Sequence, residues 1–277
     1  MMGKVTTAVI KDKKLKKEKI TMLTSYDFPM ASLVEAAGID MILVGDSMGN
    51  VVLGYNNTLA VTMDDIIHHT RAVVRAVNNT MVVGDMPFLS YHISTQEAVR
   101  NAGRIIQEGG AEAVKLEGGT ERVDTVKAIL DAQIPVMGHI GLTPQSVNQF
   151  GGFKVQGKDE ATARKLIEDA RAMAEAGVFA LVLECVPTPL AKRVTEEVDI
   201  PTIGIGAGPY CDGQVLVIND MLGFLKGHIP KFVKKFANLE PIIMDALTAY
   251  KEEVEMGVFP APEHGFTVDA EVLDKLY

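Results

Sequence analysis

Short apolar runs alternate with longer amphipathic stretches along most of the chain. The runs are rich in Ile, Val, Leu and Met, and they predict strands at Ile20–Thr24, Met41–Val44, Met81–Gly84, Ala113–Leu116, Pro135–Gly138, Ala180–Leu183, Pro201–Gly204 and Gln214–Ile218. Their hydrophobicity is nearly continuous, which is typical of strands that are buried on both faces of a parallel sheet.

Amphipathic stretches between these runs predict helices at Pro29–Ala37, Thr95–Glu108, Thr120–Ala132, Asp159–Ala176 and Pro189–Val198. Thr62, with Asp65 three residues on, indicates one further helix start, and Gly177 indicates a helix end. About eight strand–helix units predict an α/β protein with a closed (β/α)₈ TIM barrel. We expect one domain over residues 1–277, with an N-terminal helix and a helical extension from about Leu222. A doubly wound open sheet is the alternative, and the lack of a GxGxxG motif directly after the first strand weakens it.

Composition narrows the class of protein. The chain has 277 residues, of which 47% are hydrophobic, and its formal net charge of −9 disfavours a nucleic-acid partner. Its two cysteines, Cys185 and Cys211, exclude a disulfide scaffold and suit a reducing compartment. The N-terminal residues do not resemble a secretory signal, and no run approaches the ~20 apolar residues of a membrane helix. We therefore expect a cytoplasmic protein without a membrane partner.

Two polar segments interrupt the simple repeat. Lys11–Lys19 is either a patch for an anionic ligand or a solvated helix face, and the acids within it favour the solvated face. Thr143–Lys158 is rich in glycine and has no clear period. It predicts a long loop that is either a mobile lid or an inert excursion on the surface.

Acidic residues stand where three consecutive predicted strands end. Asp46, Asp85 and Glu117 follow the second, third and fourth runs. Catalytic groups of a (β/α)₈ barrel lie at the carboxyl ends of its strands, where neighbouring strands bring such side chains together. Three close carboxylates repel one another, and a hard divalent cation such as Mg²⁺ resolves that repulsion. The alternative for Asp46 or Asp85 alone is that it caps the following helix.

Three further polar residues belong to the same predicted barrel mouth. Lys115 projects to the same side of its strand as Glu117, and its charge suits a carboxylate or an enolate oxygen. Glu184 follows the apolar run Ala180–Leu183, and a carboxylate entering an apolar mouth is a candidate general base, with a salt bridge as the alternative. His139 is a metal ligand, a substrate contact or a satisfied barrel histidine, and we favour substrate contact.

Glycines alternate with small residues at the end of the seventh run, over Ile203–Gly208. Such a segment either cradles a phosphate or lets a ligand or loop approach the backbone closely. Because no basic residue stands nearby, we favour close approach.

Six blocks of the sequence resemble the motifs of the ketopantoate hydroxymethyltransferase family, in order over roughly Thr6 to Phe232. The blocks are Leu23–Asp27, Val44–Gly49, Gly84–Phe88, Val114–Gly118, Gly138–Gln145 and Ile203–Gly208. The resemblance implies transfer of a hydroxymethyl group from 5,10-methylenetetrahydrofolate to 3-methyl-2-oxobutanoate. The product is 2-dehydropantoate, formed through a Mg-stabilised enolate in pantothenate biosynthesis.

The resemblance also implies roles for single residues. Asp46 and Asp85 resemble metal ligands that lie against the substrate, and Glu117 contributes through the metal's water shell. Ser47 and Lys115 resemble substrate contacts, beside His139, and Glu184 resembles the catalytic base. Members of the family are homo-oligomers, commonly decamers of two stacked pentamers.

Two rival functions remain for such a barrel. One is a C–C lyase similar to phosphoenolpyruvate mutase and isocitrate lyase, which also binds Mg²⁺ and 2-oxo acids. Those lyases commonly carry a Cys on a mobile loop, and Thr143–Lys158 has none. The other is a non-catalytic barrel that only binds a metal–oxo-acid complex, and the candidate base Glu184 argues against it.

Overall fold

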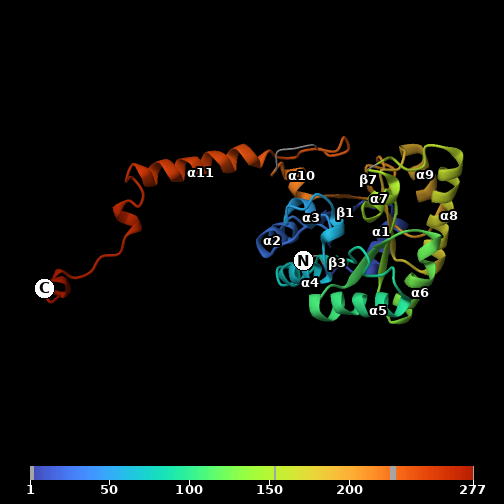
Figure 1. Cartoon of the computed structure of the whole chain (residues 1–277), viewed down its shortest axis with the longest axis horizontal. Coiled ribbons are helices and arrows are strands. Elements are labelled where there is room, and N and C mark those ends of the chain that lie inside the picture. Colours follow the sequence, from blue (N-terminus) through green and yellow to red (C-terminus); the bar gives the residue numbers. More distant parts are fainter. Residues whose placement is uncertain (1–2, 153, 225–228, 277) are drawn as a thin grey trace.

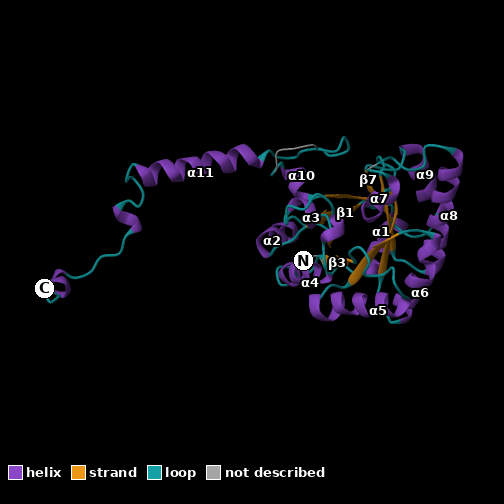
Figure 2. Cartoon of the chain, viewed as in Figure 1, coloured by secondary structure: helices purple, strands orange, loops and turns teal. Residues whose placement is uncertain are grey.

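Eight parallel strands close into a barrel in chain order, with β1 paired to β8 (Figures 1 and 2). The computed structural model describes residues 3–152, 154–224 and 229–276. The strands are β1 Ile20–Thr24, β2 Met41–Val44, β3 Met81–Asp85, β4 Ala113–Glu117, β5 Val136–Gly141, β6 Ala180–Glu184, β7 Thr202–Ile205 and β8 Gly213–Leu216. The closed barrel confirms the predicted fold class and excludes the open sheet.

The helices surround the barrel, apart from the last two in chain order, which lie in the projecting C-terminal segment (Figure 2). They are α1 Thr7–Lys16, α2 Phe28–Ala36, α3 Met48–Val51, α4 Met63–Val74, α5 Thr95–Arg104, α6 Val123–Asp131, α7 Val147–Phe150, α8 Glu160–Ala176, α9 Thr188–Glu197, α10 Ile218–Leu222, α11 Leu239–Glu255 and α12 Ala270–Asp274. Thr62 and Asp65 form a capping box at the start of α4, as predicted. Gly177 ends α8 in the left-handed conformation, also as predicted.

Some predicted boundaries are wrong. The predicted helix Thr95–Glu108 is α5 followed by a π-helical turn at Ile105–Gly109. The last predicted strand extends too far, because β8 ends at Leu216 and Ile218 already begins α10. Apolar runs alone do not separate a buried strand from the first buried turn of a helix.

The strands are covered on both faces by apolar side chains. Met22, Met41, Met81, Met137 and Val182 belong to a cluster inside the barrel. A second, larger cluster fills the space between the strands and the outer helices. Burial on both faces explains why these strands are almost uniformly hydrophobic.

Helix α1 packs against the amino-terminal end of the barrel, where Ile10 joins the inner cluster. Lys14 Nζ donates to the carbonyl oxygens of Thr195 and Ile200 and pairs with Asp212. Lys13 pairs with Asp40. The solvated-face prediction for Lys11–Lys19 is therefore wrong for Lys13 and Lys14, because they neutralise carboxylates at this end of the barrel.

The segment Thr143–Lys158 is more ordered than predicted. It contains a 3₁₀ turn at Pro144–Ser146 and then α7. Gln145 is buried, and the backbone N–H of Gln156 donates to the carbonyl of Cys185 at 3.0 Å. Residue 153 lies outside the described residues. The beginning of this segment is thus part of the barrel top, and the lid prediction is untested.

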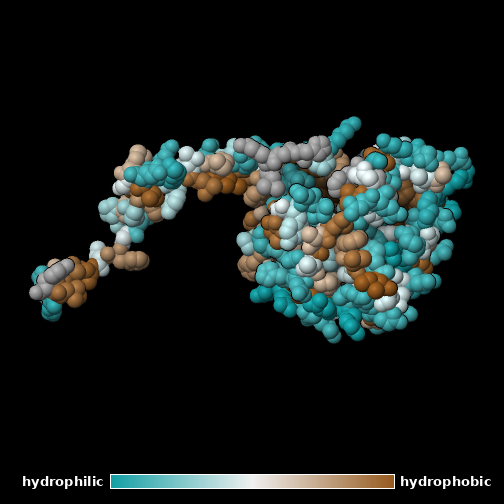
Figure 3. Space-filling model, viewed as in Figure 1, coloured by the Kyte–Doolittle hydropathy of each residue, from teal (hydrophilic) through white to brown (hydrophobic). Residues whose placement is uncertain are grey.

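The C-terminal extension lies apart from the barrel (Figure 1). Residues 225–228 of the predicted extension lie outside the described residues. Helix α11 has no buried residue, although Ile243, Leu247, Tyr250 and Val254 form an apolar stripe at helical spacing. Figure 3 shows apolar residues along this projecting segment. Within the described ranges, none of the helices combines the length and apolarity needed to cross a bilayer.

Candidate active site

The predicted site residues gather at the carboxyl ends of β2 to β6. Asp46 and Ser47 follow β2, Asp85 ends β3, Lys115 and Glu117 lie in β4, His139 lies in β5 and Glu184 ends β6. Parallel pairing brings Asp85 opposite Lys115 and Glu117 opposite His139. Asp46, Asp85, Lys115, Glu117 and His139 are buried, whereas the Glu184 side chain is 15% exposed. The fold therefore brings the predicted residues into one site.

An ion pair joins Lys115 to the first of three crowded carboxylates. Lys115 Nζ lies 2.8 Å from Asp85 Oδ1, while Asp85 Oδ2 accepts a hydrogen bond from the Asp46 backbone at 3.2 Å. The ion pair is not aligned as a hydrogen bond, so Asp85 Oδ1 has no hydrogen-bond donor in the described part of the chain. Burial alone lowers the pKa of Lys115, but the charges of Asp85, Glu117 and Asp46 outweigh it and raise that pKa. Lys115 is therefore a fixed cation.

Gln145 connects the other two carboxylates. Its Nε2 donates to Asp46 Oδ2 at 2.9 Å, and its backbone N–H donates to Glu117 Oε2 at 3.1 Å. Tyr91 Oη donates to Gln145 Oε1 at 2.7 Å and accepts from the Glu117 backbone at 3.2 Å. Sequence reasoning assigned no role to Gln145 or Tyr91, because both are uncharged and lie outside the predicted strands and helices. Membership of the block Gly138–Gln145 was the available signal for Gln145.

The carboxylates are more numerous than the cations. Burial, followed by the charge of Asp85, raises the pKa of Asp46 to about 7. Burial also raises the pKa of Glu117 well above its usual value. One lysine does not offset three acids and the nearby Glu184, so the site has a deficit of positive charge.

His139 lies between Lys115 and the two glutamates. Its Nδ1 lies 3.3 Å from Lys115 Nζ and 3.5 Å from Glu117 Oε1, and its Nε2 lies 3.4 Å from Glu184 Oε2. Burial and the charge of Lys115 lower the pKa of His139, which keeps the imidazole neutral at pH 7. His139 Nε2 has no hydrogen-bond partner among the described residues. That atom and the partly exposed Glu184 are the groups best placed to meet a ligand.

Ser47 lies beside the carboxylates, at the start of α3. Its Oγ is 2.9 Å from the hydroxyl of Tyr26, which is buried. It makes no capping hydrogen bond to α3, so its hydroxyl is not committed to the helix backbone. Tyr26 stands in the block Leu23–Asp27, but sequence reasoning assigned it no role of its own.

The donor set suits a hard cation that keeps most of its ligands from water or substrate. Within the described ranges, no group of three or more His, Cys, Asp or Glu side chains forms a complete metal site. Asp46 and Asp85 are nevertheless in contact, and Asp85 Oδ1 lacks a hydrogen-bond donor. Mg²⁺ characteristically takes one or two carboxylates from the protein and retains several waters. The residues therefore fit a cation that is bound through few direct protein ligands.

The glycines after β7 serve close approach of the chain to itself. A Cβ on Gly206, where φ is +66°, would lie 2.8 Å from the ring of Phe232. A Cβ on Gly208, where φ is +80°, would lie 2.4 Å from Oγ1 of Thr188. Close approach, the interpretation favoured from sequence, is confirmed for these positions.

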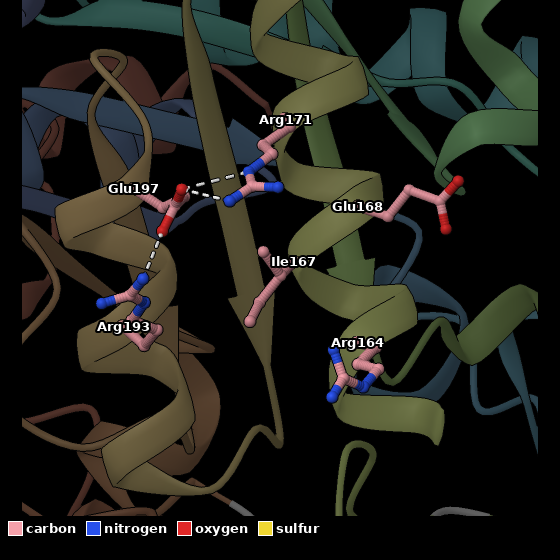
Figure 4. Close-up of a pocket in the computed structure, with 6 residues that line it drawn as sticks. All are labelled: Arg164, Ile167, Glu168, Arg171, Arg193 and Glu197. Atoms are coloured by element: carbon pink, nitrogen blue, oxygen red, sulfur yellow. Dashed lines mark hydrogen bonds and ion pairs between the residues drawn. The ribbon is translucent and has the colours of Figure 1, made fainter. Parts of the chain in front are cut away.

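A cavity of about 350 Å³ on the outer surface between α8 and α9 lies away from these groups (Figure 4). Arg171 and Arg193 both pair with Glu197 there. None of the predicted site residues lines it. Its ion pairs connect two outer helices, so we assign it no role in the chemistry.

The closed barrel with buried acids, a buried lysine and a candidate base at its carboxyl end defines a (β/α)₈-barrel enzyme. The chain belongs to the ketopantoate hydroxymethyltransferase family, because the model of that family matches residues 4–262. It is 75% identical to the 3-methyl-2-oxobutanoate hydroxymethyltransferase of Syntrophomonas wolfei subsp. wolfei over 276 residues, covering 100% of both chains. It is 60% identical to the enzyme of the same name from Enterococcus faecalis, covering 99% of this chain and 100% of the relative.

Solved structures with the same fold are far less similar in sequence. Phosphonopyruvate hydrolase in complex with oxalate and Mg²⁺ has a TM-score of 0.62 at 12% identity, covering 96% of this chain and 93% of that one. A 2,3-dimethylmalate lyase, a member of the PEP mutase/isocitrate lyase superfamily, has a TM-score of 0.56 at 15% identity, covering 100% and 95%. These likenesses concern the fold alone. The family match therefore favours the hydroxymethyltransferase over the rival lyase.

Proposed function

We propose that this enzyme transfers a hydroxymethyl group from 5,10-methylenetetrahydrofolate to 3-methyl-2-oxobutanoate and forms 2-dehydropantoate, in pantothenate biosynthesis. The observation that carries the proposal is the convergence of Asp46, Asp85 and Glu117 around Lys115, with Glu184 two strands away at the same barrel end. The names of the most similar relatives support the choice of substrate.

Asp46 and Asp85 are the residues that would hold Mg²⁺ directly, and Glu117 would act through the cation's water shell. The excess of negative charge and the raised pKa of Asp46 support a cation at this position. When bound, the cation supplies positive charge for the oxygens of the 2-oxo acid and for the charge that develops on them.

The remaining residues orient the substrate and move a proton. Lys115 and Ser47 offer donors to substrate oxygens, and His139 Nε2, next to Lys115, offers a further contact. Glu184 removes the proton from C3, and the electron pair left there forms the bond to the one-carbon unit. The two C–N bonds that join the one-carbon unit to N5 and N10 of the folate break, and a water molecule supplies the oxygen of the new hydroxyl group. Tetrahydrofolate leaves with one hydrogen on each of those two nitrogens, one from C3 and one from water.

Exchange of the C3 proton of 3-methyl-2-oxobutanoate in D₂O tests the first half of this reaction. We expect exchange in the presence of Mg²⁺ without any folate, and incorporation of a labelled one-carbon unit once the folate is added. Exchange of the C3 proton without incorporation of the labelled carbon would favour the rival function, a C–C lyase. Binding of the oxo acid with neither exchange nor incorporation would favour a non-catalytic barrel.

We also propose a homo-oligomer, as the family resemblance implies, in the form of a decamer in the cytoplasm. The exposed apolar stripe on α11 supports self-association, because a row of large apolar side chains in water is unfavourable. Cys185 and Cys211 are both free thiols, which suits a reducing compartment.

A further inference from the structure

A chain of polar contacts crosses the barrel mouth from β3 to β6. Lys115 Nζ lies 2.8 Å from Asp85 Oδ1 and 3.3 Å from His139 Nδ1. His139 Nε2 in turn lies 3.4 Å from Glu184 Oε2. In the proposed reaction the oxygens of the 2-oxo acid lie toward Asp85 and Lys115, and its C3 lies at Glu184. The carbon chain of the substrate therefore runs from β3 and β4 toward β6.

The strand after β6 brings an apolar side chain next to the base. Glu184 and Ile205 are paired in parallel register, and the N–H of Cys185 donates to the carbonyl of Ile205 at 2.9 Å. Val182 and Ile203, two residues earlier on each strand, both belong to the cluster inside the barrel. Because side chains alternate along a strand, Glu184 and Ile205 also project inward. They lie side by side on strands that are about 4.8 Å apart.

Ile205 also has surface that is free at the carboxyl end of the barrel. Among the described residues, the partly buried apolar side chains packed against the inner cluster are those of Val5, Phe179 and Ile205. Val5 donates to the carbonyl of Asn79, which precedes β3, and Phe179 directly precedes β6, so both lie at the amino-terminal end. Ile205 is instead the last residue of β7. Its exposed part therefore faces the mouth in which the substrate is proposed to bind.

We propose that Ile205 forms the wall that contacts the methyl groups on C3 of the oxo acid, and that it thereby sets which 2-oxo acids the enzyme accepts. The inference rests on the proposed function, because it takes C3 to lie at Glu184. The methyl groups extend from C3 away from the carboxylate and the oxo oxygen. Beyond Glu184 the next inward side chain is Ile205, and the buried Val215 follows on β8. Contact with these apolar side chains removes the methyl groups from water.

Such a wall selects substrates by size. One methylene group too many or too few in an apolar pocket changes kcat/KM by about 10–200-fold. 3-Methyl-2-oxopentanoate differs from 3-methyl-2-oxobutanoate by one methylene group, and this ethyl branch needs more room beside C3. Both acids carry a single hydrogen on C3, so removal of that hydrogen by Glu184 can be compared directly between them.

The test measures C3 exchange in D₂O for both acids, with Mg²⁺ and without folate, in Ile205→Ala and Ile205→Val. We expect the ratio of kcat/KM for the larger acid to that for the smaller acid to rise about tenfold or more in Ile205→Ala, and by less in Ile205→Val. For the smaller acid the loss should appear mainly as a higher KM, because an apolar contact stabilises the bound substrate and the transition state alike. Ile203→Val is the matched control, since Ile203 lies on the same strand but is fully buried. It should leave the ratio unchanged.

The same measurements separate this inference from the proposed function. An unchanged ratio in both Ile205 variants, with exchange intact in the unmodified enzyme, would overturn the role of Ile205 alone. An equal rise of the ratio in Ile203→Val would also overturn it, because general loosening of the barrel would then set the selectivity. Absence of C3 exchange of 3-methyl-2-oxobutanoate in the unmodified enzyme would instead overturn the proposed function and, with it, the premise of this inference.

Discussion

Gln145 Nε2 donates a hydrogen bond of 2.9 Å to Asp46 Oδ2 across 99 residues of sequence. The same amide nitrogen donates to the carbonyl of Met86 at 3.0 Å. Gln145 thereby connects the segment after β5 to the ends of β2 and β3. It holds in place a carboxylate that would otherwise be free to turn away from Asp85.

Replacing Gln145 tests that role. In Gln145→Ala, the hydroxyl of Tyr91 and the carboxylate of Asp46 lose buried partners, and each unsatisfied group costs about 1–3 kcal/mol. We expect a lower free energy of unfolding in urea and weaker Mn²⁺ binding, measured by electron paramagnetic resonance. Gln149→Ala, an exposed glutamine four residues on, is the control for the segment. Unchanged stability and Mn²⁺ affinity in Gln145→Ala would remove this bridging role.

Tyr91→Phe separates the hydroxyl of Tyr91 from its ring. The variant leaves Gln145 Oε1 and the backbone N–H of Glu117 without their partner, so we expect about 1–3 kcal/mol lower stability. The ring is retained, so its buried packing should be unchanged. Tyr210→Phe, at a tyrosine that is 51% exposed, is a neutral comparison. Unchanged stability in Tyr91→Phe would show that these two hydrogen bonds do not stabilise the barrel mouth.

The raised pKa of Asp46 predicts a pH-dependent effect of Mg²⁺ on stability. With a pKa of about 7, against an ordinary 3.8, folded Asp46 holds a proton between about pH 4 and 7 that the unfolded chain does not. In the metal-free protein this contribution to stability is lost as the pH rises through 7. A cation binds the ionised form, so the rise in Tm on adding Mg²⁺ should be greater by about 2–4 °C at pH 8 than at pH 6.

The measurement is the difference in Tm between a sample with Mg²⁺ and a sample with chelator at the same pH. Burial and Lys115 lower the pKa of His139, and burial and Arg122 lower that of His92. Both histidines therefore make the metal-free protein more stable as the pH rises through about 6.5, which opposes Asp46. Their contribution cancels when scans with and without Mg²⁺ are subtracted. Asp46→Asn should reduce the pH dependence of that difference, with Glu117, whose pKa is also raised, supplying the remainder. An unchanged pH dependence in this variant would contradict the assignment.

Glu184→Gln keeps the shape of the side chain and removes its basicity. A positioned general base contributes about 10²–10⁴-fold to a rate, so C3 exchange should fall by at least about a hundredfold. Binding of 3-methyl-2-oxobutanoate, measured by calorimetry with Mg²⁺, should change little. Glu197→Gln, on the outer helix α9, is the matched control. Exchange that survives in Glu184→Gln would transfer the role of base to another residue.

The sequence predicted the barrel and the charged part of the site because both follow from local patterns. Apolar runs that end in an acid mark Asp85, Glu117 and Glu184 as strand ends, and parallel pairing then brings them together. The partners Gln145 and Tyr91 could not be predicted in this way. Their roles depend on how two loops fold back over the barrel mouth, and a neutral polar residue in a loop has no periodic signal.

The exposed stripe on α11 gives the last prediction. Leu247 and Tyr250 are 59% and 60% exposed, which is unfavourable for large apolar side chains unless another copy covers them. Leu247→Asp should therefore lower the mass of the assembly, measured by light scattering after size-exclusion chromatography. Ala249→Asp places the same charge on the polar side of α11, near Asp245 and Glu252, and should leave the mass unchanged. Equal masses for Leu247→Asp and the unmodified enzyme would show that this stripe does not hold the oligomer together, wherever else its subunits meet.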